Sequence, residues 1–265
     1  MLQPVKRGRE LIEEIDRTIT ATPSLWWLGH AGFVIRFASI TFYIDPCLTD
    51  LPGRERRIAS PLAPDEVRHA DMVFATHAHP GHMDTATLAP MLERSRAARL
   101  VLPRTAADAA HAGGVEYSRM TSTDSGLRIE YFKDNLYGRV YAVPSAHPRQ
   151  DWTQAGGYPY LGYLIRFGRW TIYHAGDTVW YEELARHIRP FNVNVALLPV
   201  GGNNFSMSEA AQLANDIGAR WVVPMHYGTF DEDRESSFVS HMLGQRPEQA
   251  FKVFQCGEGW TVPED

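Results

Sequence analysis

Cysteine is scarce in this sequence, and long hydrophobic runs are missing. Only two of its 265 residues are cysteines, Cys47 and Cys256. Two thiols are too few for a disulfide framework, so we expect a reducing compartment. Either thiol could be reactive, but small buried cysteines are commoner, and we favour that interpretation. No apolar run approaches the roughly 20 residues that a membrane-spanning helix needs.

A strong net charge and a signal-like N-terminus are missing too. The formal net charge of −5 provides no long-range attraction for nucleic acid or for an anionic membrane. The first residues lead into an acidic, amphipathic stretch without the apolar core of a secretory signal. We therefore expect a cytoplasmic protein that binds no nucleic acid and inserts into no membrane.

The chain is long enough for one large domain or two small ones. No glycine- or serine-rich linker divides it, so we predict a single domain over residues 1–265. Within it, residues 1–22 form an N-terminal helical extension. The helix predicted over residues 7–20 carries four aliphatic residues at helical spacing: Leu11, Ile12, Ile15 and Ile19.

Beyond the extension, short β-rich runs and helical segments form two similar halves. The β-rich runs are 25–28, 33–37, 40–44, 72–75, 99–103, 127–132, 139–143, 161–167, 170–173, 193–200, 221–225, 251–255 and 260–262. The helical segments are 84–95, 105–112, 182–188 and 206–217, and Ser206 with Glu209 has the form of a capping box. Such alternation is typical of α/β layering. We predict two sheets stacked face to face with helices outside, a four-layer αββα sandwich.

Three histidines fall within one short segment. Residues 75–84 read ATHAHPGHMD and directly follow the apolar run at 72–74. This order predicts a buried strand that ends in a loop carrying His77, His79 and His82. Neutral imidazole is the commonest metal ligand among side chains, and clusters of it suit zinc, iron and related ions. A polar loop that is rich in histidine by chance is the alternative.

Further polar residues end other β-rich runs. Asp45, His147, Asp177 and His226 each follow an apolar run of the predicted sheets. One histidine at a strand end is usually structural. Several such positions together with the His77–His79 pair are hard to explain without a metal.

These motifs, in this order, resemble the metal-binding motifs of the metallo-β-lactamase fold. Within that superfamily, WLGH at 27–30, IDP at 44–46, YHAGD at 173–177 and VPMH at 223–226 are most similar to a narrower group. That group contains the L-ascorbate-6-phosphate lactonases and the N-acyl-phosphatidylethanolamine phospholipase D-like hydrolases. The resemblance extends from about Trp26 to Trp260. It is specific for the fold and less so for a substrate.

The resemblance implies a centre with one or two divalent metal ions. One ion would be held by His77, His79 and His147. The second would be held by His82 and His226, and Asp177 would bridge the two. A carboxylate between two dications lowers their repulsion, and a metal-bound water can approach a pKa near 7. Zinc and manganese are the expected ions, and iron is an alternative.

Gly81 departs from the family pattern, which usually has Asp at this position. Glycine supplies neither an oxygen ligand nor a base, so the second ion would have fewer protein ligands. The second ion could bind more weakly, the protein could use one ion at the first site, or another carboxylate could replace the missing one. We rank Asp84 last for that replacement and expect Asp45 to accept a hydrogen bond from a ligand imidazole. Restoring the carboxylate with Gly81→Asp is expected to raise metal occupancy.

Other residues near the motifs have open roles. His30 borders the site in related enzymes and is a candidate catalytic residue beside Asp177 and His226, although it could equally shape its turn. His174 orients Asp177, lines the pocket or makes a structural hydrogen bond. The remaining histidines are expected at the surface: His69, His111, His187 and His241.

Substrate contacts are less well determined by the sequence. The charged run 54–57 could contact an anionic substrate, but a solvated loop is the interpretation we favour. The loop 201–204 either faces the site with its backbone N–H groups or is a plain turn. Trp180 and Tyr227 are candidate pocket aromatics, and residues 148–159 with Trp152 are a candidate lid.

The sequence therefore predicts a metal-dependent hydrolase of the lactonase or phosphodiesterase type, acting on a small polar molecule with or without a phosphate group. The sequence allows a homo-oligomer. One alternative is a redox enzyme with mononuclear iron at the three-histidine site. The other is a catalytically degenerate metal-binding or regulatory protein, because of Gly81.

Overall fold

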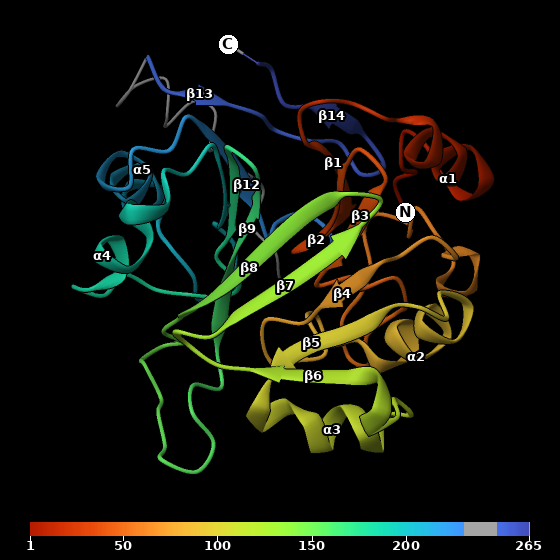
Figure 1. Cartoon of the computed structure of the whole chain (residues 1–265), viewed down its shortest axis with the longest axis horizontal. Helices are drawn as coiled ribbons and strands as arrows, with labels where there is room; N and C mark the ends of the chain where they lie inside the picture. The colour runs from red at the N-terminus through yellow and green to blue at the C-terminus, as the bar shows by residue number, and fades with distance from the viewer. Residues whose placement is uncertain (231–247, 265) are drawn as a thin grey trace.

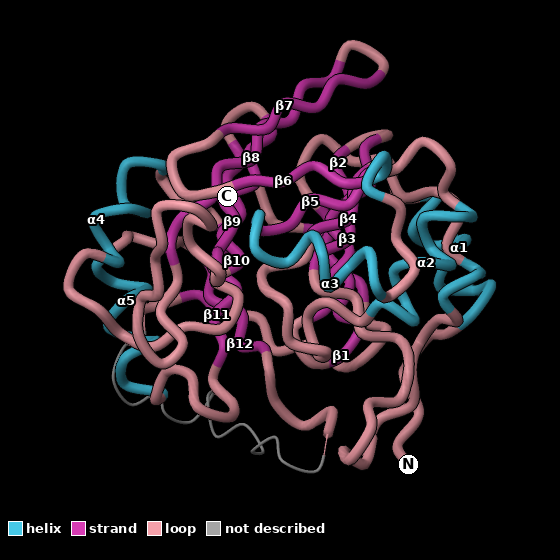
Figure 2. Tube along the Cα trace, turned by 90° about the horizontal axis from the view of Figure 1, so that it is seen from below, coloured by secondary structure: helices cyan, strands magenta, loops and turns pink. Residues whose placement is uncertain are grey.

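Two mixed β-sheets pack face to face, with helices on both outer sides (Figure 1). The computed structural model describes residues 1–230 and 248–264. Figure 2 shows α1 and α2 outside one sheet and α4 and α5 outside the other. This is the predicted four-layer αββα sandwich. Within the described ranges, no helix combines the length and apolar character required to cross a membrane.

The first sheet has the order β14-β1-β2-β3-β4-β5-β6. Its strands are β1 (Ser24–Gly29), β2 (Gly32–Phe37), β3 (Ile40–Ile44), β4 (Met72–Phe74), β5 (Arg99–Pro103), β6 (Met120–Thr123) and β14 (Gly259–Thr261). The strands β1 to β3 form an antiparallel meander, and β3 to β6 are parallel. The helices of this half are α1 (Gly8–Arg17), α2 (Thr85–Arg94) and α3 (Ala107–Ala112), with short 3₁₀ turns at Pro64–Glu66, Arg104–Ala106 and Tyr117–Arg119.

The second sheet has the order β13-β12-β11-β10-β9-β8-β7. Its strands are β7 (Arg128–Lys133), β8 (Leu136–Pro144), β9 (Leu161–Phe167), β10 (Trp170–His174), β11 (Val195–Pro199), β12 (Trp221–Met225) and β13 (Ala250–Phe251). Strands β7 to β10 are antiparallel neighbours, and β10 to β13 are parallel. The helices are α4 (Leu184–Ile188), a 3₁₀ turn at Arg189–Phe191, and α5 (Met207–Asp216).

The main core lies between the sheets because side chains alternate between the two faces of each strand. Phe42 and Phe74 of the first sheet face Tyr163 and Phe167 of the second, and all four are fully buried. Ring centroids of Phe74 and Tyr163 lie 5.4 Å apart, as do those of Phe42 and Phe167. A second core, under α1 and α2, takes the opposite face of the first sheet, where Tyr43 is buried.

Several predicted boundaries are wrong in detail. The first helix ends at Arg17, with Thr18 as its C-cap, and Ile19 is 70% exposed. The strand predicted at 251–255 is reduced to Ala250–Phe251, and the helix predicted at 105–112 begins with a 3₁₀ turn. The short strand β6 was not predicted, because its sequence MTST has no apolar periodicity.

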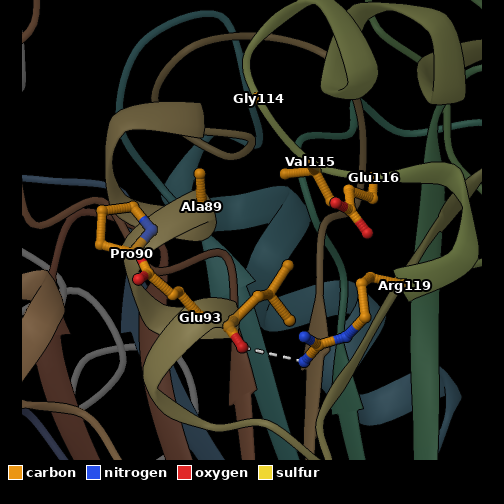
Figure 3. A pocket seen from close by; sticks show the side chains of 8 residues that line it. Ala89, Pro90, Glu93, Gly114, Val115, Glu116 and Arg119 are labelled. Carbon is orange, nitrogen blue, oxygen red and sulfur yellow. Dashed lines mark hydrogen bonds between the residues drawn. The ribbon is translucent and has the colours of Figure 1, made fainter.

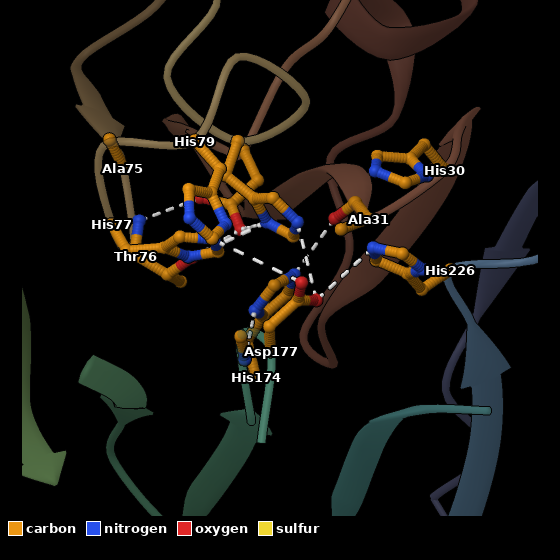
Figure 4. A network of polar contacts seen from close by, with 12 residues as sticks. His30, Ala31, Ala75, Thr76, His77, His79, His174, Asp177 and His226 are labelled. Atoms are coloured by element: carbon orange, nitrogen blue, oxygen red, sulfur yellow. Dashed lines mark hydrogen bonds and ion pairs between the residues drawn. The ribbon is translucent and has the colours of Figure 1, made fainter. Parts of the chain in front are cut away.

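The candidate site residues share one edge of the sandwich. Strands β1, β3 and β4 of the first sheet end there, and so do β8, β10 and β12 of the second. Carboxyl ends of parallel strands are where open α/β sheets bind ligands. Figure 4 shows His30, His77, Asp177 and His226, which follow four of these ends, meeting in one cluster. Asp45 joins it through His82, and His147 joins it beside Asp177.

Candidate metal centre

The histidine loop after β4 is fixed by Asp45. The carboxylate of Asp45, which is fully buried, accepts hydrogen bonds from the backbone N–H of Thr76 at 2.8 Å and from its hydroxyl at 2.7 Å. At the far end of the loop, Asp84 caps α2 by accepting from the Thr87 backbone and binds the Thr49 hydroxyl at 2.7 Å. Asp84 is therefore a structural cap and does not replace the missing carboxylate at Gly81.

His77, His79 and Asp177 form the first cluster. One ligand atom from each lies within 4.8 Å of the others. The Nε2 atom of His77 is 3.0 Å from Nδ1 of His79 and 3.9 Å from Oδ2 of Asp177. His147 stands at the rim of this cluster, with Nε2 also 3.9 Å from Oδ2 of Asp177. The structure thus brings together all four residues predicted for the first ion.

The second cluster lies on the other oxygen of Asp177. Nε2 of His82 and Nε2 of His226 are each 3.2 Å from Oδ1 of Asp177. Figure 4 shows His77 and His79 on one side of Asp177 and His226 on the other, with His30 beside it. The carboxylate therefore presents one oxygen to each group of imidazoles. This is the geometry that a bridging carboxylate requires.

Neighbouring groups orient these side chains. Nδ1 of His82 donates to Oδ2 of Asp45 at 2.7 Å, as predicted, which turns Nε2 toward Asp177. The Thr76 hydroxyl donates to Asp45, so Nδ1 of His77, 3.0 Å from it, is assigned as a donor and Nε2 is left to face the cluster. These partners leave the inner nitrogens of both histidines available as ligand atoms.

The sequence did not single out Thr76 or Asn204 as contributors. The side-chain amide of Asn204 donates to Oδ1 of Asp177 at 3.2 Å and accepts from the Thr178 backbone at 2.9 Å. The loop 201–204 thus faces the site, with a side chain rather than the predicted backbone N–H groups in contact with Asp177. Gly201 is required there, because a Cβ at this position would lie 1.7 Å from the carbonyl oxygen of His226.

Three residues of the site adopt left-handed backbone conformations that side chains rarely take. The φ angles are +52° for His30, +46° for Asp45 and +63° for His226. Histidine and aspartate tolerate this region better than most residues, but it still carries strain. Such strain concentrates at functional sites because the surrounding structure must hold it.

Burial and mutual charge set the protonation of the cluster. Burial lowers the pKa of His77 well below its usual value and also lowers the pKa of His79 and of His147. Burial raises the pKa of Asp177, but His226 and His82 outweigh it and hold that pKa well below the usual range. For His82, burial lowers the pKa, yet the Asp177 and Asp45 carboxylates raise it to about 10.

This donor set fits divalent metal ions. An imidazole nitrogen 3.2 Å from a carboxylate oxygen must either carry a proton or share a cation with it. A dication can replace such protons, since metal ligands bind in their deprotonated forms. Imidazoles with one carboxylate suit zinc, iron and related ions. The residues present therefore could hold a metal on each side of Asp177.

A cleft of about 390 Å³ opens over the two clusters. It is lined by imidazoles, by the 201–204 loop and by the segment 51–54. Arg54 reaches this lining, and Arg56 is 6% exposed with its guanidinium on the carbonyl oxygens of Cys47 and Thr49. The solvated-loop interpretation of residues 54–57 is therefore wrong for Arg56, whereas Arg54 is half-buried and lines the cleft.

Neither predicted pocket aromatic lines this cleft. Tyr227 stacks on Trp27 with ring centroids 5.3 Å apart, and Trp180 packs against the main core. Trp152, in the candidate lid, is 58% exposed. The lid stays a prediction. Cys47 and Cys256 are both buried, as expected.

The other histidines divide into structural and surface residues. His174 is buried, with Nε2 2.8 Å from the Ala31 carbonyl oxygen, and Nδ1 accepts from the Gly176 N–H. It is thus a structural residue of the turn before Asp177. His69 was expected at the surface, and this is wrong: its ring is held between Tyr43 and Asp16. His111 is exposed, His187 half-buried, and His241 lies outside the described residues.

A separate hollow of about 360 Å³ lies between α2 and the segment 114–119 (Figure 3). Its one arginine, Arg119, donates to the carbonyl oxygens of Leu92, Ser95 and Ala98. These contacts satisfy the carboxyl end of α2 and leave the guanidinium with a structural role. The candidate functional residues therefore lie in the histidine cleft, not in this hollow.

Comparisons with known proteins agree with this fold. The family described as "Beta-lactamase superfamily domain" matches residues 41–227. A "UPF0173 metal-dependent hydrolase" of Thermococcus kodakarensis is 33% identical over 239 residues, which cover 88% of this chain and 96% of that protein.

Solved structures share the architecture at lower identity. Igni18, described as a metallo hydrolase from Ignicoccus hospitalis, superposes with a TM-score of 0.72 at 23% identity, covering 92% of this chain and all of the other. CmlA, described as a diiron β-hydroxylase from Streptomyces venezuelae, has a TM-score of 0.71 at 17% identity, covering 91% of this chain and 54% of CmlA. These likenesses concern the fold alone.

The two stacked sheets and the histidine-rich edge define a protein of the metallo-β-lactamase type. The chain belongs to the metallo-β-lactamase superfamily, and the UPF0173 metal-dependent hydrolases are its homologues.

Proposed function

We propose that this protein is a metal-dependent hydrolase that acts on a lactone or a phosphodiester of a small polar molecule. The observation that carries the proposal is Asp177, whose two oxygens face separate groups of imidazoles at 3.2 Å and 3.9 Å. His77, His79 and His147 would hold one ion, and His82 with His226 would hold the other. Zinc or manganese is the proposed ion.

Bound ions would supply a water acidified toward neutral pH and would polarise the attacked carbonyl or phosphoryl oxygen. The chain's own residues prepare the centre for this chemistry. Asp45 and Thr76 fix the rings of His82 and His77, so their inner nitrogens need no reorientation. Asn204 holds Asp177 from the cleft side, at Oδ1.

The substrate is proposed to carry an anionic group. Arg54 lines the cleft beside the imidazoles, and a guanidinium recognises phosphate or carboxylate through paired hydrogen bonds. A phosphorylated lactone and a phosphodiester both satisfy this condition. We place the lactone first because the motifs at 27–30 and 173–177 are most similar to those of the sugar-phosphate lactonases.

A redox enzyme is the second candidate. The observation in its favour is the fold shared with CmlA, whose description names a diiron hydroxylase. Fold does not fix function, so the native metal must decide between the two.

The experiment is metal analysis followed by activity assays. Protein purified without chelator is analysed for bound metals, then assayed against a phosphorylated lactone, its unphosphorylated analogue and a chromogenic phosphodiester. Zinc or manganese with hydrolysis of an anionic substrate supports the proposal. Iron without hydrolysis favours the redox enzyme, and protein that binds no metal contradicts both and leaves the degenerate alternative.

A further inference from the structure

The imidazole of His30 occupies the space that a side chain at position 81 would need. A Cβ built on Gly81 would lie 2.6 Å from Nε2 of His30 and 3.0 Å from its Cδ2. Such a contact is far inside van der Waals distance, so no larger side chain fits at position 81 while His30 keeps its position. The imidazole of His30 thus fills the volume into which the carboxylate of the family pattern would extend.

The backbone of His30 is fixed from three directions. Its N–H donates to the Thr229 hydroxyl at 2.6 Å, and its carbonyl oxygen accepts from the indole N–H of Trp27 at 3.0 Å. The same oxygen accepts from the backbone N–H of His226 at 2.9 Å. These bonds hold a residue whose φ is +52°, and they tie the end of β1 to the end of β12. The backbone that carries the ring is therefore held in place by the fold.

The ring of His30 lies among the candidate ligands of the second ion. Its centroid is 3.9 Å from that of His226 and 5.2 Å from that of His82, and the side chain is 1% exposed. One nitrogen from each of these three imidazoles lies within 4.8 Å of the others. Nitrogens that share one tetrahedral zinc at about 2.0–2.1 Å lie roughly 3.4 Å apart. Closing onto an ion thus requires only modest side-chain shifts.

We propose that His30 is a protein ligand of the second metal ion and takes the place of the carboxylate that Gly81 lacks. This inference rests on the proposed function, since it presumes a metal at the centre. The second site then consists of three imidazoles and Oδ1 of Asp177. It becomes the counterpart of the first site, where three imidazoles face Oδ2.

An imidazole in place of the carboxylate changes the charge and the metal preference of the centre. Asp177 is the one carboxylate among the proposed ligands, so two dications would keep a formal charge of +3 instead of the +2 left by a second carboxylate. Imidazole favours zinc and iron, whereas carboxylates suit manganese. The protein is therefore expected to prefer zinc to manganese at the second site, and the more positive centre suits an anionic substrate.

The test removes the ring of His30 and restores a carboxylate at position 81. His30→Gly removes the ring and tolerates the positive φ, while Gly81→Asp alone places a side chain against His30 and is expected to disturb the site rather than raise occupancy. The double variant His30→Gly with Gly81→Asp restores a carboxylate in the vacated space. Each protein is titrated with Zn²⁺ and with Mn²⁺, and the ions per chain are counted by elemental analysis. Co²⁺ absorption reports the coordination number.

The expected results separate this inference from the proposed function. Wild type should bind two Zn²⁺, and His30→Gly should keep the first ion and bind the second about 100-fold more weakly or worse. The double variant should regain the second ion with a preference shifted toward Mn²⁺. Two tightly bound Zn²⁺ in His30→Gly, or a single ion in wild type, would overturn the role of His30 and leave a metal enzyme standing. Wild type that binds no metal would overturn both proposals.

Discussion

Asp45 accepts a hydrogen bond of 2.7 Å from Nδ1 of His82, and the same imidazole directs Nε2 at Asp177 from 3.2 Å. A buried carboxylate behind the ring thus sets which nitrogen faces the centre. Outer partners of this kind typically contribute 10–100-fold to metal affinity.

We therefore expect Asp45→Asn to weaken binding of the second Zn²⁺ by about 10–100-fold. Asparagine tolerates the φ of +46°, so the backbone is preserved while the charge is lost. Isothermal titration with Zn²⁺ measures the change. Asp71→Asn is the matched control, because Asp71 is also buried but binds Thr41 and Lys133 away from the site. Equal loss of affinity in both variants would contradict a specific role for Asp45.

Replacement of His77 or His147 by Ala tests the first ion. Each removes a candidate ligand beside Oδ2 of Asp177, so the first Zn²⁺ and hydrolysis should be lost together. His111→Ala, at an exposed position on α3, should leave both unchanged. Elemental analysis and an activity assay on the same samples provide the measurement. Full activity in a metal-free variant would sink the metal mechanism.

Arg54→Gln tests the anionic substrate. Loss of a charge-assisted hydrogen bond, typically about 1.5–3 kcal/mol, should raise KM for an anionic substrate roughly 10–100-fold and leave a neutral lactone unaffected. Arg186→Gln is the control, since that side chain is 81% exposed on α4. Zinc content and thermal stability of each variant show whether the centre is intact. Equal effects on charged and neutral substrates would remove Arg54 from substrate recognition.

His69 should make stability depend on pH. Burial lowers its pKa in the folded protein, with Asp16 opposing and Arg36 adding to the shift. The unfolded chain therefore takes up this proton at higher pH, and stability decreases as pH falls below about 6.5. The dependence due to one such group is at most about 1.4 kcal/mol per pH unit.

The variant His69→Gln should lose this part of the pH dependence. Urea unfolding of both proteins at pH 7.5 and 5.5, in the presence of a chelator, gives the two differences in unfolding free energy. The chelator keeps the contribution of the cluster histidines equal in both proteins. A slope as steep in the variant as in wild type would show that His69 is not the group that titrates.

The sequence alone predicts those helices and strands whose ends are set by residues close by in the chain. The strands at Leu161–Phe167 and Trp221–Met225 were predicted to the residue, because their apolar runs end at polar or turn residues. The capping box of Ser206 and Glu209 forms as predicted. The sequence did not predict β6, because its polar residues form a strand only by pairing with β5. The predicted helix end near Ile19 was wrong, because the helix stops at its C-cap, Thr18.

The site residues, too, could be predicted from the sequence only in part. Residues next to strand ends could be named from the sequence, since each follows its own apolar run. The overlap of His30 with position 81 depends on two strands packing at one edge, which local patterns do not contain. Asn204 and Arg54 lie in loops without periodicity, so only the folded chain brings them to the cleft.

The candidate ligands come from both sheets. His30, His77, His79 and His82 follow strands of the first, whereas His147, Asp177 and His226 follow strands of the second. Each ion would thus link the two halves of the sandwich through its ligands. Loss of metal would weaken the contact between the two sheets at this edge as well as stop the reaction. Stability and activity would therefore be lost together.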